Sequence, residues 1–120
     1  MNKETEELAH RVVDAIQDKK GRGITIVDLS DIAGAVCPCF VICQGNSPTQ
    51  LDAIARQVGD RLRLEAGVKP IAAEGLRAAR WIALDYVDVM VHIFLPEVRS
   101  FYNLEGLWAD AALTEVPDLD

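Results

Sequence analysis

The chain has 120 residues, half of them apolar, and a formal net charge of −7. This length fits one domain, and the apolar content is enough for a hydrophobic core that needs no disulfide or metal. The acidic balance argues against a general nucleic-acid binder, which needs clustered Lys and Arg, and suits a basic protein partner. No apolar run approaches the roughly 20 residues that span a bilayer.

The N-terminal residues and the three cysteines, Cys37, Cys39 and Cys43, indicate in which cellular compartment the protein works. The first residues are acidic and amphipathic, with no apolar signal region. The cysteines are odd in number. We therefore expect a cytoplasmic protein whose thiols are reduced.

The N-terminal half predicts a helix, two strands and a second helix. Leu8, Val12 and Ile16 recur at helical spacing in the first helix. Residues 24–29 are rich in β-branched side chains, and a loop over 30–38 precedes a second strand at 40–44. That strand is apolar almost throughout, as expected of a central strand covered on both faces. Ser47 and Pro48 then give the second helix a clear start, and Gly67 ends it.

The C-terminal half predicts three strands and a helix. A strand over 68–73 contains Pro70, which favours the edge of a sheet. Residues 81–85 and 88–94 predict a hairpin with Tyr86-Val87 as its turn, so that Asp85 faces Asp88. Residues 96–108 close the chain as a helix or a pair of helical turns, which Gly106 interrupts or ends. The order of elements predicts a single α/β domain over residues 1–120, with a mixed sheet of about five strands flanked by helices.

One face of the predicted hairpin carries charged and aromatic side chains in a combination that is unusual for a hydrophobic core. Side chains alternate along each strand, so Ile82 and Leu84 point to the core. The opposite face carries Trp81, Asp85, Asp88, Met90, His92 and Phe94. Aromatic side chains beside two carboxylates are typical of a surface that recognises a basic protein. The alternative is that the aspartates are solvated turn residues and that the aromatics pack under a helix.

Two kinds of chemical site find little support. Cys37, Cys39 and Cys43 do not make a zinc site, which needs four ligands in recognisable pairs. The turn Gly45-Asn46-Ser47 joins a strand to a helix, as in nucleotidyltransferases, but residues 53–60 lack the acidic pair that would bind metal there. We therefore predict no metal and no cofactor.

Several segments in order resemble the ribosomal silencing factor family, also called Iojap-like. The resemblance covers about residues 7–111 and is most specific in two blocks, Asp85 to Phe94 and Arg99 to Trp108. It implies a nucleotidyltransferase-like fold without enzymatic activity. It also implies binding to the large ribosomal subunit through ribosomal protein L-fourteen, which would prevent the small subunit from joining and repress translation. A homodimer is plausible for this family, whose hairpin usually has Gly where this chain has Val87.

The resemblance and the hairpin face together predict the partner-binding residues. These are Trp81, Asp85, Tyr86, Asp88, His92, Phe94, Arg99, Tyr102, Glu105 and Trp108. The alternative for this set is that Arg99 pairs internally with Asp85 or Glu105, and that Phe94, Tyr102 and Trp108 belong partly to the core. Two other functions remain open on the sequence. One is a divergent metal-dependent nucleotidyltransferase that uses Asp85 and Asp88 as ligands, and the other is a dimeric adaptor with no ribosome binding.

Overall fold

The most apolar strand of the sequence lies inside the sheet. In the computed structural model, which describes residues 1–119, this strand is β2 (Cys39–Gln44), and five of its six residues are buried. It pairs antiparallel with β1 (Arg22–Asp28) and parallel with β5 (Val89–Phe94). Burial on both faces explains why the strand has no apolar–polar alternation.

The other strands extend the sheet on both sides of this centre. The hairpin partner β4 (Trp81–Asp85) follows β5, and β3 (Ala72–Glu74) lies at that edge. The opposite edge is β6 (Ala112–Val116), which pairs antiparallel with β1. The order is therefore β3-β4-β5-β2-β1-β6, with β2–β5 as the parallel pair. The prediction of a mixed sheet flanked by helices is confirmed, with six strands in place of about five.

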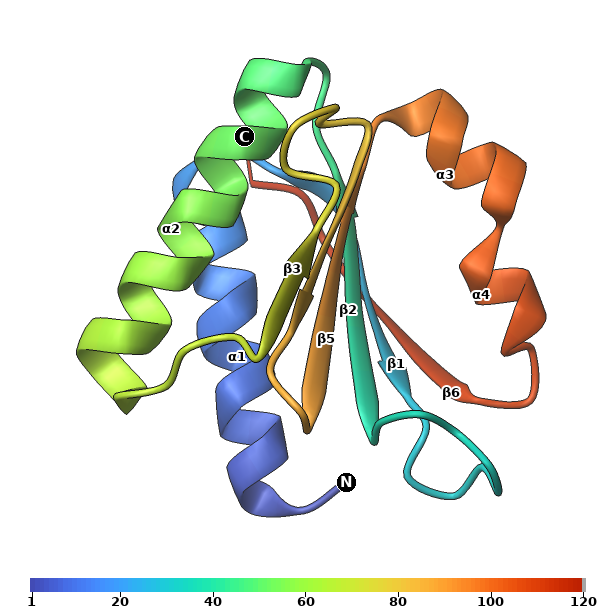
Figure 1. Cartoon of the computed structure of the whole chain (residues 1–120). Coiled ribbons are helices and arrows are strands. Elements are labelled where there is room, and N and C mark those ends of the chain that lie inside the picture. The colour runs from blue at the N-terminus through green and yellow to red at the C-terminus, as the bar shows by residue number, and fades with distance from the viewer. Residues whose placement is uncertain (120) are drawn as a thin grey trace.

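Two long helices cover one face of the sheet. Helix α1 (Lys3–Asp18) and helix α2 (Pro48–Ala66) pack side by side on the same side of the strands (Figure 1). The start of α2 is as predicted: the Ser47 hydroxyl accepts the Gln50 N–H at 3.1 Å, and Gly67 adopts the left-handed conformation at the end. No helix within residues 1–119 is long and apolar enough to span a membrane.

The second face is covered by shorter elements. Helix α3 (Pro96–Tyr102) and helix α4 (Leu104–Leu107) lie on the side away from α1 and α2 (Figure 1). A second core forms beneath them from Phe40, Ile42, Phe94 and Val98, together with residues of the loop that follows β1. The sheet is therefore the middle of three layers.

Three element boundaries differ from the predictions. Strand β6 was missed because its residues are exposed and show little apolar periodicity. The predicted strand at 68–73 begins only at Ala72, after Pro70. Residues 96–107 form a pair of short helices, one of the two predicted forms, but the break falls at Asn103, which has a φ of 47°, and Gly106 lies within α4.

The hairpin register also differs. Asp85 pairs with Met90, and the Tyr86 N–H donates to the Val89 carbonyl at 2.9 Å. Val87 and Asp88 are therefore the turn, so the predicted pairing of Asp85 with Asp88 is wrong. Because the turn moves by one residue, each residue of β4 pairs with a residue of β5 two positions further along than predicted. A shift by two residues keeps every side chain on the face that the alternation predicted.

We expect the substitution Val87→Gly to stabilise the protein. Val87 has a φ of 73°, a conformation that β-branched residues rarely adopt and glycine adopts freely. Relief of this strain should raise the free energy of unfolding by about 1 kcal/mol in urea denaturation. Val36→Gly is the control, because Val36 is another exposed loop valine but has no positive φ. Equal effects of both changes would contradict the assignment of strain to Val87.

Candidate partner-binding surface

Trp81 is fixed by contacts from three aromatic neighbours. Its ring stacks on Phe94 with centroids 4.9 Å apart and packs against Tyr102 at 4.7 Å. Its indole N–H donates to His92 Nδ1 at 3.1 Å. The side chain is nevertheless only partly buried. Trp81 therefore presents a rigid aromatic surface whose orientation is set from within the second core.

His92 is a neutral acceptor in this cluster. It is 5% exposed and makes an edge contact with the Phe40 ring at 4.8 Å. Burial lowers its pKa to about 4, so the ring is uncharged at neutral pH. Because Nδ1 accepts the Trp81 hydrogen, the proton of the neutral ring is on Nε2. Nε2 is buried and makes no hydrogen bond within residues 1–119.

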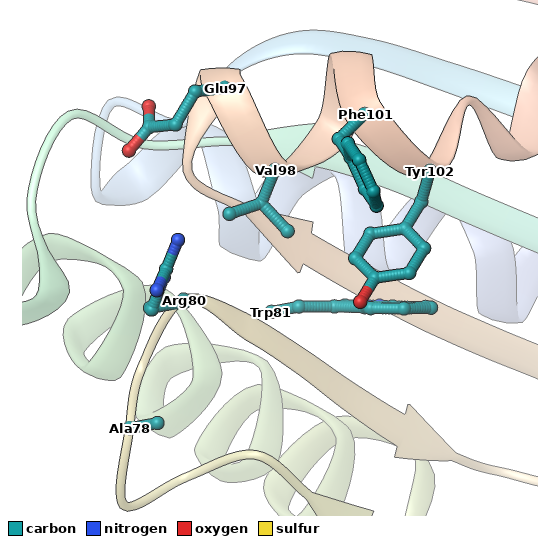
Figure 2. A pocket seen from close by; sticks show the side chains of 7 residues that line it. All are labelled: Ala78, Arg80, Trp81, Glu97, Val98, Phe101 and Tyr102. Carbon is teal, nitrogen blue, oxygen red and sulfur yellow. The ribbon is translucent and has the colours of Figure 1, made fainter.

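A groove opens beside Trp81, between the start of β4 and helix α3. Its volume is about 580 Å³, and Figure 2 shows the Trp81 ring lying flat beneath Tyr102, with Phe101 beside it. Phe101 is 80% exposed and Tyr102 48%. Arg80 and Glu97 line the same groove, which we call the aromatic groove. Phe101 was not among the predicted site residues, although it falls within the block from Arg99 to Trp108 that carries the resemblance.

The acidic residues of the hairpin lie away from this groove. Asp85 is at the other end of β4 from Trp81, roughly 13 Å along the strand at 3.3 Å per residue. Its Oδ1 accepts the Val87 N–H at 2.8 Å, and Asp88 is exposed in the turn. The two carboxylates therefore do not face each other across the strands. No group of three or more His, Cys, Asp or Glu side chains in the described chain is arranged to hold a metal ion.

Arg99 and Glu105 bind each other. The Arg99 guanidinium contacts both Glu105 oxygens at 3.3 Å and donates to the Gly23 carbonyl at 2.6 Å. It also reaches Gln44 and Thr25, so it joins α3 and α4 to β1 and β2. The Arg99 side chain is only 12% exposed. Both residues thus serve the fold, and the alternative of an internal pair between Arg99 and Glu105 is confirmed.

Three of the predicted residues are buried within the domain. Phe94 is fully buried, and His92 and Tyr86 are nearly so. Tyr86 belongs to the core under α1 and α2, on the opposite face from Trp81. Trp108 is partly buried, with its ring 6.2 Å from Phe40. Of the predicted set, Asp88 and Tyr102 are exposed, and the partly exposed residues are Trp81, Asp85, Arg99, Glu105 and Trp108.

The cysteines are unsuited to act as nucleophiles. Cys37, Cys39 and Cys43 are all buried and free. Burial raises the pKa of Cys39 and Cys43 to about 12, so both thiols are neutral at pH 7. Only the thiolate reacts readily, so these side chains serve as small apolar groups.

Comparison with known proteins identifies the family. The model of the family described as "Ribosomal silencing factor during starvation" matches residues 2–120. The chain belongs to the ribosomal silencing factor family. It is 42% identical over 102 residues to ribosomal silencing factor RsfS of Bacillus subtilis, covering 85% of each chain. It is 38% identical over 78 residues to the chloroplastic protein Iojap of Zea mays, covering 65% of this chain and 33% of that protein.

Solved structures agree with this assignment. A crystal structure of a Chromobacterium violaceum protein matches with a TM-score of 0.83 and 33% identity, covering 91% of this chain and 88% of the other. A Bacillus halodurans structure matches with a TM-score of 0.77 and 35% identity, covering 92% and 99%. The predicted membership in the silencing factor family is confirmed.

The buried histidine predicts a pH-dependent stability. A folded-state pKa of about 4 against an ordinary 6.5 means that the unfolded chain binds the proton more tightly. Stability should therefore fall by about 3 kcal/mol as the pH drops from 6.5 to 4. His92→Asn, which keeps an acceptor for Trp81, should remove most of this fall in urea denaturation at each pH. His10→Asn changes the exposed histidine and should leave the loss of stability at low pH unchanged. If His10→Asn removed this loss and His92→Asn did not, the role of His92 would be contradicted.

Arg99 should matter more for stability than other arginines. Arg99→Met would leave the Glu105 carboxylate and the Gly23 carbonyl without their partner, at a cost of about 3 kcal/mol. Arg22→Met breaks only the exposed pair with Asp118 and should cost less than about 1 kcal/mol. Thermal and urea unfolding of both variants make the comparison. Similar losses would refute a structural role specific to Arg99.

Proposed function

We propose that this protein binds the large ribosomal subunit and, by occupying its surface, prevents the small subunit from joining. The partner on the subunit is ribosomal protein L-fourteen, and the result is repression of translation. No bond is made or broken in this process, so the protein is not an enzyme. The proposal extends the family membership of the chain to a mechanism and a partner.

The aromatic groove is the observation that carries this proposal. Trp81 is held in one orientation by Phe94, Tyr102 and His92 before any partner arrives. A pre-organised aromatic anchor loses little conformational entropy on binding, and such residues dominate the energetics of protein interfaces. Phe101 and Tyr102 extend the same apolar surface along α3. A helix or loop of the partner would cover these rings.

Charge supports a basic partner. The net charge of −7 attracts a positively charged protein surface and speeds the encounter. Asp85 and Asp88 lie at the far end of β4 from the aromatic groove, where they would meet Lys or Arg side chains at the rim of the interface. Contacts at a rim affect the association rate and salt dependence more than the final affinity.

A homodimer and a cytoplasmic location complete the proposal. Phe101 and Leu107 are 80% and 71% exposed on α3 and α4, which is an unusual degree of exposure for large apolar side chains. A second copy that covered them would compete with the ribosome for the same surface. The cytoplasm is where a ribosomal partner would be met.

The proposal is tested by co-sedimentation with isolated large and small ribosomal subunits. The native protein should sediment with the large subunit only. Phe101→Ala and Tyr102→Ala should each weaken binding by about tenfold or more, because truncating an interface anchor costs about 2 kcal/mol. Both side chains are exposed, so the fold should survive, as circular dichroism can check. Asp85→Ala/Asp88→Ala should weaken binding mainly at low salt.

Leu64→Ala is the matched control. Leu64 is 75% exposed on α2, on the opposite face of the sheet from Phe101, and its truncation should leave sedimentation unchanged. Sedimentation with neither subunit would refute the proposed function. Sedimentation that ignores the α3 variants but responds to Leu64→Ala would move the binding surface to α2.

A further inference from the structure

A second groove lies on the other face of the sheet, between α2 and residues 68–77. One part has a volume of about 650 Å³ and an adjoining part about 480 Å³. The two parts share Arg56, Gly59 and Pro70, so they form one continuous groove, which we call the α2 groove. It is separate from the aromatic groove, which shares none of these residues.

A glycine inside a helix keeps the α2 groove open. Gly59 lies in the middle of α2, where glycine is less favourable for the helix than alanine. A Cβ at this position would meet no atom within 4 Å. Packing within the described chain therefore gives no reason for glycine here. The space above Gly59 is part of the groove, which points to an occupant that approaches the helix backbone.

The lining of the groove is basic in an otherwise acidic protein. Arg56 pairs with Asp52 at 2.7 Å and Arg63 with Asp60 at 3.2 Å, both on the helix surface. Lys69 and Arg77 make no ion pair within residues 1–119. Asp52 and Asp60 thus neutralise two of the basic side chains that line the groove, and two more, Lys69 and Arg77, have no carboxylate partner there. This local excess contrasts with a net charge of −7 for the chain.

The floor and rim of the groove are apolar. Leu84 and Ala55 form part of the floor, and Leu76 at the rim is 46% exposed. Tyr86 also lines the groove, is 6% exposed, and its hydroxyl makes no hydrogen bond within the described chain. An unpartnered buried hydroxyl destabilises the folded protein, and a ligand that formed a hydrogen bond with it would remove this penalty.

We propose that the α2 groove binds an acidic, amphipathic segment of a second protein. The apolar side of the segment would cover Leu76 and the open backbone at Gly59, and its carboxylates would pair with Lys69 and Arg77. RNA fits less well, because an excess of two basic residues neutralises few phosphates and the groove offers no exposed aromatic ring for base stacking. Since the two grooves lie on opposite faces, the protein would hold this segment and a ribosomal partner at the same time.

Gly59→Leu is the variant that tests the proposal. Leucine fills the groove and also favours helix, so the variant should fold at least as stably as the native protein. The probe is a fluorescein-labelled peptide with Leu at helical spacing and Glu elsewhere, followed by fluorescence anisotropy. The native protein should bind it, and Gly59→Leu should weaken binding by about tenfold or more. Lys69→Glu/Arg77→Glu should have a similar effect.

Lys3→Glu/Lys19→Glu is the matched charge control. It makes the same change in net charge at exposed sites on or beside α1, outside the α2 groove, and should leave peptide binding unchanged. The same peptide with Lys in place of Glu should not bind. Failure of the native protein to bind the acidic peptide, or binding that survives Gly59→Leu, would overturn the proposal. Tighter binding of single-stranded oligouridine than of the peptide, abolished by Gly59→Leu, would also overturn it in favour of RNA. No ribosome enters this assay, so its outcome is independent of the proposed silencing function.

Discussion

The second face of the sheet depends on how Trp81 is held. Phe94 supports its ring from within the core, Tyr102 covers it from α3, and His92 accepts its indole hydrogen. These three residues come from β5 and α3, so a single side chain links the hairpin to the C-terminal helices. The Trp81 ring cannot be displaced without disturbing all of them. The partly exposed surface that Trp81 offers is consequently rigid.

The two faces of the sheet are covered in unequal ways. Helices α1 and α2 are long and bury a continuous apolar stripe against the strands. Helices α3 and α4 contain seven and four residues, and the hydrogen bonds of Arg99 hold them against the sheet. Short helices have little intrinsic stability and rely on tertiary contacts. Phe101 and Leu107 remain exposed on these two helices, where the proposed partner would cover them.

Local patterns in the sequence predicted most of the fold. Ser47, Pro48 and Gly67 marked both ends of α2, because helix capping depends on side chains within a few positions. The period-two alternation placed Trp81 and Ile82 on the correct opposite faces. Strand β6 could not be found in this way, since an exposed edge strand has no buried face to impose a pattern. The hairpin register was missed because Val87 occupies a positive φ that its residue type does not suggest.

The structure distributes the predicted site residues over both faces of the sheet. Trp81 and Tyr102 lie together as expected, but Arg99 and Glu105 bind each other, and Tyr86 faces the opposite core. Resemblance to a family indicates which residues matter without separating those that contact a partner from those that hold the fold. That separation needs burial and hydrogen bonds, which arise only once distant segments such as Gly23 and Arg99 meet.

We propose that this protein covers the large subunit and thereby prevents the small subunit from joining. Light scattering of purified large and small subunits, mixed in magnesium with increasing amounts of this protein, measures joining directly. The account predicts that scattering at equilibrium falls as the native protein is added, and that Phe101→Ala shifts the fall to higher protein concentration. Subunits that join equally well at a saturating concentration of native protein would contradict it.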